Sequence, residues 1–246
     1  MLKFKEDKYN GLIVETESID TSASIFEVGL KELLEEATCQ KKSLLWIDLN
    51  SEQFNHIAIA LQMGFAFHNC EATRTTLTYR VSKDAYIPVA PTHTIGVGAV
   101  VINDKNELLM VRDRIHTSRS LYKLPGGMLE PSQSLEEGVV REVWEETGIK
   151  AKLVKMVSIL NSHPFTFNKS NMYIVFQLEA ESFEIDVVDT GEIEFALWMP
   201  LEEFFAHEEM SEFQKNLVDS TLNSKGLSLK AYDNLVPHKK HIEVYR

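Results

Sequence analysis

The chain has 246 residues, enough for one large domain or two modest ones, each with a hydrophobic core. Its hydrophobic content of 44% and charged content of 25% are ordinary for a soluble globular protein. The formal net charge of -12 argues against general nucleic-acid binding, because that binding depends on Lys and Arg to neutralise phosphates. Binding of a small anionic molecule would therefore need local cations or a bound metal ion.

Redox and targeting signals lead us to expect a cytoplasmic protein without a membrane partner. The N-terminal sequence MLKFKEDKYN lacks the apolar segment of a secretory signal, and no stretch approaches about 18 consecutive apolar residues. Cys39 and Cys70 are the only cysteines and lie far apart in the sequence, so a disulfide framework is not expected.

The N-terminal third of the chain has the pattern of a small α/β domain. A strand is expected around 12–14, and Ser24 with Glu27 offers a capping box to a helix with one apolar face. The short apolar run at 44–47 is bounded by polar residues and predicts a buried strand.

A second helix and a strand hairpin follow in the same region. The helix is expected from about Glu52 to a stop at Gly64, and the strands at 65–68 and 75–81. His68 stands among aromatic residues, where a histidine is more often a packed, hydrogen-bonded group than a catalytic base.

A proline-containing segment separates two domains. Pro88 and Pro91 remove backbone donors and favour extended backbone, so 86–92 is predicted as a linker between a domain at 1–85 and a domain at 93–246.

The second domain is expected to open with a strand hairpin. Gly96 and Gly98 lie in a strand at 94–102 and indicate close backbone approach or a bulge. They are not a dinucleotide fingerprint, because no helix follows them. The returning strand covers 107–112.

The stretch at 127–149 predicts a helix with defined ends. Ser134 and Glu137 form a capping box, and Gly148 supplies a left-handed stop, so the helix is expected over 134–147.

Three carboxylates on this helix indicate a metal site. Glu142, Glu145 and Glu146 stand at i, i+3 and i+4, which places them on one stripe of the helix. Like charges this close repel each other, and Mg²⁺ would relieve the repulsion while keeping coordination positions for water and substrate phosphates. The three residues alone also fit a solvated acidic face.

The surroundings of these glutamates resemble the Nudix box. Its pattern is Gly, five residues, Glu, seven residues, then Arg-Glu-apolar-any-Glu-Glu-any-Gly-apolar. The residues that match are Gly127, Arg141, Glu142, Val143, Glu145, Glu146, Gly148 and Ile149, and the one departure is Gln133 in place of the first Glu. The resemblance implies a Nudix α/β/α sandwich with a mixed sheet.

The N-terminal domain also carries a resemblance. Trp46 and the sequence GFAFH at 64–68 are similar to the pre-Nudix domain of plant ADP-ribose/NADH pyrophosphatases and of the animal fibroblast growth factor antisense Nudix protein. In that group the domain has an acetyltransferase-like fold, and related members imply a homodimer. Acetyltransferase activity is not expected here, because residues 1–85 lack clustered glycines that could wrap the pyrophosphate of coenzyme A.

The family resemblance implies hydrolysis of a nucleoside diphosphate derivative with Mg²⁺ or Mn²⁺ as cofactor. ADP-ribose is the first candidate and NADH the second, with release of AMP. The residues of the box bind only phosphates and metal, so they do not discriminate among ADP-ribose, NADH, coenzyme A and nucleoside triphosphates. Gln133 brings no charge, and a catalytically weak domain that senses a nucleotide is the alternative.

The resemblance also assigns roles to residues. Glu142, Glu145, Glu146 and the carbonyl of Gly126 are expected to hold the metal, and Arg141 to pin a carboxylate. The general base is either a glutamate of the box or one in the loop at 192–194, where Glu194 is the candidate.

Substrate contacts are expected outside the box. The candidates are Arg112, Phe165, Phe167 and Lys169: the rings could stack on adenine or ribose, and Lys169 could meet a phosphate. Core packing is the alternative for both rings. The polar loop at 113–121 either lines the substrate entrance or is a solvated loop. Helices are further expected at 201–206 and 208–222.

Overall fold

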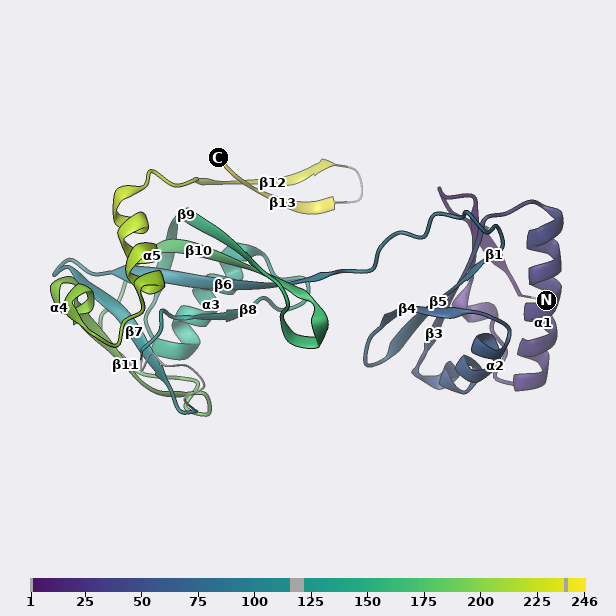
Figure 1. The fold of residues 1–246 in the computed structure, drawn as a ribbon, viewed down its shortest axis with the longest axis horizontal. Helices are drawn as coiled ribbons and strands as arrows, with labels where there is room; N and C mark the ends of the chain where they lie inside the picture. Colours follow the sequence, from purple (N-terminus) through teal and green to yellow (C-terminus); the bar gives the residue numbers. More distant parts are fainter. Residues whose placement is uncertain (1, 116–121, 237–238) are drawn as a thin grey trace. The chain divides into compact units, whose positions relative to one another are not determined.

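The computed structural model describes residues 2–115, 122–236 and 239–246 (Figure 1). The chain divides into two compact units, Met1–Pro91 and Thr92–Arg246. Within the described ranges, no helix has both the length and the apolar character needed to cross a membrane.

The first unit is a mixed five-stranded sheet with helices. The strand order is β1-β2-β3-β5-β4; β2 and β3 run parallel and the other neighbours antiparallel. The elements are β1 (Phe4–Glu6), β2 (Gly11–Val14), α1 (Ala23–Cys39), β3 (Leu44–Asn50), a 3-10 helix (Ser51–His56), α2 (Ile57–Gln62), β4 (Ala66–Cys70) and β5 (Arg74–Arg80).

The two faces of this sheet differ because side chains alternate along each strand. Leu45, Ile47 and Leu49 of β3 are fully buried in a core that also contains residues of α1. The helix α1 begins two residues earlier than a Ser24 cap would place it: Ser22 is the N-cap and makes no side-chain cap hydrogen bond. The predicted capping box at this helix was therefore wrong, although the helix itself is confirmed.

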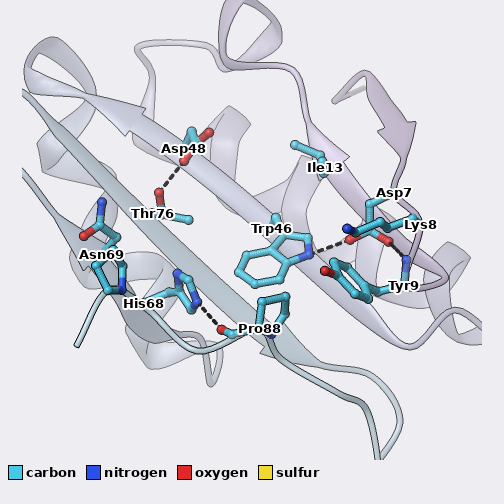
Figure 2. Close-up of a pocket in the computed structure, with 11 residues that line it drawn as sticks. Asp7, Lys8, Tyr9, Ile13, Trp46, Asp48, His68, Asn69, Thr76 and Pro88 are labelled. Atoms are coloured by element: carbon cyan, nitrogen blue, oxygen red, sulfur yellow. Dashed lines mark hydrogen bonds between the residues drawn. The ribbon is translucent and has the colours of Figure 1, made fainter. Parts of the chain in front are cut away.

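The opposite face of the sheet borders a pocket of ≈ 490 Å³ (Figure 2). Trp46 and Asp48, which alternate with the core residues of β3, line it together with Pro88 and Pro91. His68 Nε2 lies 2.7 Å from the carbonyl oxygen of Pro88, and its ring stands edge-on to Trp46 with centroids 4.9 Å apart. His68 is thus packed and hydrogen-bonded, as predicted.

The second unit is built on a mixed sheet with the order β11-β7-β6-β10-β9, and β8 pairs with β6. The strands β6 and β10 are parallel, while the other pairs are antiparallel. The elements are β6 (His93–Ile102), β7 (Glu107–Asp113), β8 (Gly126–Met128), α3 (Leu135–Thr147), β9 (Ala151–Ser162), a 3-10 turn (Thr166–Asn168), β10 (Ser170–Ala180), β11 (Ile193–Pro200), α4 (Leu201–Ala206), α5 (Glu212–Asn223), β12 (Leu229–Val236) and β13 (Lys239–Tyr245).

Helices cover both faces of this sheet. Val97, Ala99 and Val101 of β6 pack in one cluster with Val139 of α3. Val100 lies in a second cluster with residues of α4 and α5, on the other side of the sheet (Figure 1). Successive apolar side chains of β6 point to opposite faces of the sheet, and helices cover both faces. The predicted α/β/α sandwich with a mixed sheet is therefore confirmed.

The C-terminal part differs from the prediction in two respects. The helix expected over 208–222 begins at Glu212, because Ser211 and Gln214 form a capping box that fixes its start. Beyond α5, β12 and β13 pair as an antiparallel hairpin that the sequence analysis did not foresee. Tyr245 of this hairpin packs against Phe176 in the core beside α3.

Candidate active site

The helix α3 has the ends that its sequence predicted. The Ser134 hydroxyl accepts from the Glu137 amide at 3.2 Å, and the Glu137 carboxylate accepts from the Ser134 amide at 2.9 Å. Gly148 ends the helix with φ 73, and a Cβ there would overlap the backbone of Asp186. With both ends fixed, the direction in which each glutamate of the helix points is set.

Glu146 points from α3 into the interior of the unit. The residue is 3% exposed, and one carboxylate oxygen accepts from the amide of Gly126 at 2.8 Å. The other oxygen lies 3.1 Å from Lys123 Nζ. Burial raises the pKa of Glu146 to about 7, although Lys123 and the Gly126 amide favour the charged form.

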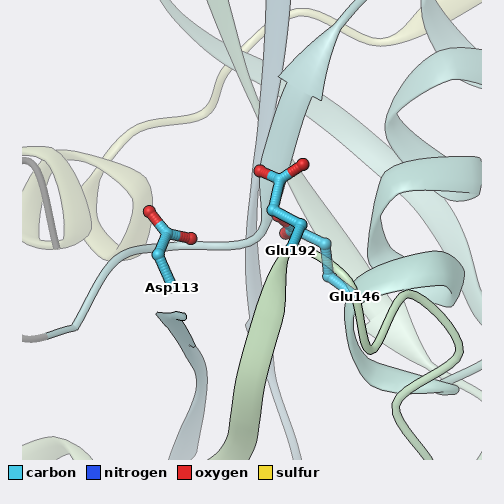
Figure 3. Close-up of side chains that lie close together, drawn as sticks. All are labelled: Asp113, Glu146 and Glu192. Atoms are coloured by element: carbon cyan, nitrogen blue, oxygen red, sulfur yellow. The ribbon is translucent and has the colours of Figure 1, made fainter. Parts of the chain in front are cut away.

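Two further carboxylates gather around Glu146 (Figure 3). Asp113 is the last residue of β7, and Glu192 directly precedes β11. One carboxylate oxygen from each of the three residues lies within 4.8 Å of the others. The side chain of Lys123 contacts all three, at 2.7 Å from Asp113, 3.1 Å from Glu146 and 3.5 Å from Glu192.

Glu142 and Glu145 are held by Arg141. The guanidinium lies 2.8 Å from Glu142 and 2.6 Å from Glu145, and it donates to the carbonyl of Met128 at 3.1 Å. Burial raises the pKa of Glu142, the Arg141 charge opposes this shift, and Glu145 adds to it. A Cβ at Gly127 would come within 2.7 Å of the Glu142 carboxylate, so a side chain at this position would displace that carboxylate.

Residues 92–220 match the family described as NUDIX domain, and residues 2–81 match a second description, Nudix hydrolase domain. The chain belongs to the Nudix hydrolase family. Both units have a match, so the predicted two-domain resemblance is confirmed.

Named relatives come from plants and animals. Nudix hydrolase 2 of Arabidopsis thaliana is 33% identical over 208 residues, which are 83% of this chain and 74% of that protein. Nudix hydrolase 8 of the same plant is 31% identical over 208 residues, 83% of this chain and 56% of that protein. Nucleoside diphosphate-linked moiety X motif 6 of Homo sapiens is 33% identical over 188 residues, 73% of this chain and 59% of that protein. The chain therefore spans little more than half the length of the last two.

Among solved structures, the MutT protein from Methanosarcina mazei Go1 is 28% identical, with a TM-score of 0.44. The match covers 55% of this chain and 96% of that one.

The side chain of Tyr173 occupies the space that side chains would need at the glycines just before the Nudix box. Its ring, from β10, lies against the backbone of β6, where a Cβ at Gly96 would come within 2.7 Å of the ring. Cβ atoms at Gly98 and Gly126 would overlap the Tyr173 hydroxyl or approach it closely. The predicted close approach at the two glycines of β6 is thus confirmed, and the approaching group is an aromatic side chain.

Gln133, the departure from the Nudix box, stays in contact with the box arginine. Its amide oxygen accepts from the Glu130 amide at 3.1 Å and from Arg141 at 3.4 Å. The Gln133 side chain therefore stabilises the loop before α3. Because it is uncharged, the ion pairs of Arg141 are those with Glu142 and Glu145.

The residues present fit a hard divalent cation. Mg²⁺ and Mn²⁺ prefer carboxylate and carbonyl oxygens, and the site offers the carboxylates of α3 with those of Asp113 and Glu192. Glu142 and Glu146 are both buried, and burial raises their pKa values. A bound cation would favour the charged form of both carboxylates. Asp113, Lys123 and Glu192 were not singled out individually in the sequence, because strand pairing brings them to α3.

The structure places several predicted residues outside this cluster. Glu194 lies on β11 and pairs with Arg112 at 2.9 Å, and the Arg112 guanidinium stands 5.5 Å from the ring centroid of Phe195. Of the three loop residues at 192–194, it is Glu192 that joins the carboxylates.

The aromatic candidates lie in the loop between β9 and β10. Phe165 is 40% exposed and Phe167 is 91% exposed, so neither ring is a core residue. Lys169 closes the loop through its carbonyl, which accepts from the Phe165 amide at 2.8 Å. The next residue, Ser170, is paired with His93 at the start of β6. Most of the polar loop predicted at 113–121, residues 116–121, lies outside the described residues.

Proposed function

We propose that this protein is a metal-dependent hydrolase that cleaves the pyrophosphate of a nucleoside diphosphate derivative. ADP-ribose is the first candidate substrate, with release of AMP, and NADH is the second. The observation that carries the proposal is the convergence of Asp113 and Glu192 on buried Glu146 of the Nudix box. Membership of the Nudix hydrolase family supports the same reaction class.

Under this proposal, each residue of the site has a defined role. Glu142, Glu145, Glu146 and the carbonyl of Gly126 would hold Mg²⁺ or Mn²⁺, with Asp113 and Glu192 as the further carboxylates on the facing strands. The ion would screen phosphate charge and make a bound water more acidic. Arg141 keeps Glu142 and Glu145 in fixed positions through its two short contacts.

Two loop glutamates compete for the role of general base. Glu192 has a side chain that is 62% exposed and that belongs to the carboxylate group, so it can receive a proton from a water in the site. Glu194 is engaged with Arg112. We therefore assign the base to Glu192 in preference to Glu194, with the box glutamates as the other choice.

Recognition of the nucleoside is assigned to the β9–β10 loop. The nearly fully exposed ring of Phe167 offers a free face on which a base can stack, and Phe165 and Lys169 lie on the same loop. The family resemblance adds an acetyltransferase-like N-terminal unit and a homodimer to the proposal.

A substrate panel tests the proposed function. The protein with saturating Mg²⁺ would be given ADP-ribose, NADH, coenzyme A and a nucleoside triphosphate in parallel, and nucleoside monophosphate release would be measured. Glu146→Gln should lower turnover by at least about a hundredfold, because it removes a charged metal ligand. Glu179→Gln, a change at a solvent-exposed ion pair, is the control and should match the unmodified enzyme. Near-normal turnover of folded Glu146→Gln would refute the assignment.

The nucleotide sensor is retained as a second candidate because Gln133 adds no charge beside Arg141. Calorimetric binding of ADP-ribose in excess Mg²⁺ or Mn²⁺, with no release of AMP over hours, would favour the sensor. Steady release of AMP under the same conditions would eliminate it.

A further inference from the structure

Lys123 is placed beside the carboxylate cluster by the backbone. Its amide donates to the Val111 carbonyl at 2.9 Å and its carbonyl accepts from the Val111 amide at 2.9 Å, so the residue is bridged to β7. Its side chain is only 31% exposed and ends among Asp113, Glu146 and Glu192. The position of this ammonium group therefore follows from strand pairing and is not that of a freely solvated lysine.

The ammonium group contacts the same atoms that a metal ion would need. The three carboxylates have oxygens within 4.8 Å of one another, and Lys123 Nζ contacts all three residues at 2.7 to 3.5 Å. A lysine ammonium group carries a single positive charge at neutral pH, and the three carboxylates around Nζ favour that charge.

A divalent ion and an ammonium group repel each other when they share carboxylates. An ammonium on a flexible four-carbon stem can move aside without a change in the backbone, unlike a guanidinium held at two carboxylates at once. Arg141 is of the second kind, since it pairs with both Glu142 and Glu145.

We propose that Lys123 is a positioning residue that acts as a tethered cation: it holds Asp113, Glu146 and Glu192 together in the metal-free enzyme and competes with a divalent ion for them. This inference rests on the proposed function, because the ion belongs to the proposed hydrolase. It adds a specific residue that sets how tightly the ion binds and that has to leave the carboxylates when the ion enters.

Metal titration tests the competition. Mn²⁺ binding would be followed by electron paramagnetic resonance, with unmodified protein compared with Lys123→Met and Lys123→Arg. Lys123→Met keeps a side chain of similar size and removes the positive charge. The apparent affinity of the Mn²⁺ ion that binds most weakly should therefore rise by about tenfold or more. Lys123→Arg keeps a cation at the position and should bind Mn²⁺ no more tightly than the unmodified protein, because a guanidinium moves aside less readily than an ammonium group. Identical titrations for Lys123→Met and the unmodified protein would overturn the proposal.

A second measurement needs no variant. The rate of acetylation of each lysine by acetic anhydride would be measured by mass spectrometry with and without saturating Mn²⁺. Release from the carboxylates should increase labelling of Lys123 by about fivefold or more, while Lys152, which pairs with Glu179 on the surface, should be unchanged.

The two failures can be told apart. If Mn²⁺ binds but the labelling of Lys123 does not change, the tethered-cation proposal is wrong and the hydrolase proposal stands. If no Mn²⁺ binds to the unmodified protein, both are wrong.

Discussion

At the scale of single residues, Glu146 combines two opposing demands. Its carboxylate is buried, which disfavours the charge, yet it receives a hydrogen bond from Gly126 and contacts Lys123, which favour the charge. The balance raises its pKa to about 7. An acid with a pKa that is higher in the folded state contributes most to stability below its unfolded pKa, near about 4.3, and loses that contribution as the pH rises through the folded value.

The pH dependence of stability tests this balance in metal-free protein. With a chelator present, the free energy of unfolding of the unmodified protein should contain a component that falls between about pH 4 and pH 7, because Glu146 must then become charged in its buried position. Glu146→Gln should lack that component, whereas Glu179→Gln should retain it. Urea unfolding at four pH values measures both. Parallel pH profiles for Glu146→Gln and the unmodified protein would show that another group is responsible.

Gly98 tests the close approach of Tyr173. Gly98→Ala should lower the free energy of unfolding by about 1 to 3 kcal/mol, because the new methyl group would overlap the tyrosine hydroxyl. In a Tyr173→Ala background the same change should cost much less. Chemical unfolding of the four proteins measures the coupling, and equal costs in both backgrounds would contradict the proposed overlap.

Phe167 tests substrate stacking. Because the side chain is 91% exposed, Phe167→Ala should change stability by less than about 0.5 kcal/mol. Its KM for the active nucleotide should rise by about fivefold to a hundredfold, which corresponds to the loss of one base-stacking contact. Leu222→Ala, a change at a residue that is 43% exposed on α5, serves as the control. An unchanged KM would remove Phe167 from the substrate-binding residues.

At the scale of elements, α3 is held at its N-terminus by a local cap and by a residue from a distant part of the chain. Ser134 accepts from the Glu137 amide, as the local sequence predicts. Glu243 of β13 accepts from the amides of Leu135 and Glu136, at 2.8 and 3.3 Å. A carboxylate at this end also interacts favourably with the helix dipole. The C-terminal hairpin therefore helps to position the helix that carries the glutamates of the site.

Removal of the Glu243 cap should lower the free energy of unfolding by a measurable amount. Glu243→Ala should lower the free energy of unfolding by about 0.5 to 2 kcal/mol, the usual cost of a lost N-terminal cap. Glu243→Gln, which keeps an acceptor oxygen without the charge, should cost less. Tyr245→Phe is the matched control, because it removes a hydroxyl that donates to Glu243 at 3.2 Å and leaves the capping carboxylate in place. A stable Glu243→Ala protein would mean that Ser134 alone caps α3.

At the scale of the whole molecule, the described residues bury their apolar side chains in separate cores. The core of the first unit includes Phe26, Leu45 and Leu77, and the clusters on the two faces of the second sheet contain no residue of the first unit. We therefore expect each unit to have its own free energy of unfolding.

Expression of residues 1–91 alone tests this division. Because all of the buried residues of its core come from the same segment, the fragment should fold and unfold cooperatively on heating, as measured by circular dichroism. Loss of cooperative unfolding, with retained secondary structure but no fixed aromatic signals, would show that its core depends on residues beyond position 91.

Local sequence relations were enough to place α3 and to identify the family of the chain. The capping box at Ser134, the stop at Gly148 and the spacing of Glu142, Glu145 and Glu146 are relations between near neighbours, so local rules suffice to place them. The strand predicted at 94–102 is likewise confirmed as β6, because its apolar residues are also near neighbours in the sequence.

The other side chains that meet this helix could be identified from the fold alone. Asp113 and Lys123 reach Glu146 because β7 and the segment before β8 are paired, and Glu243 reaches α3 through the hairpin. Regular alternation would place Glu192 and Glu194 on the same face, but an irregularity in the β11–β7 register between Ile193 and Phe195 lets Glu194 pair with Arg112 while Glu192 stays with the carboxylates. Strand order and register bring residues together across long sequence separations, and local periodicity does not contain that information.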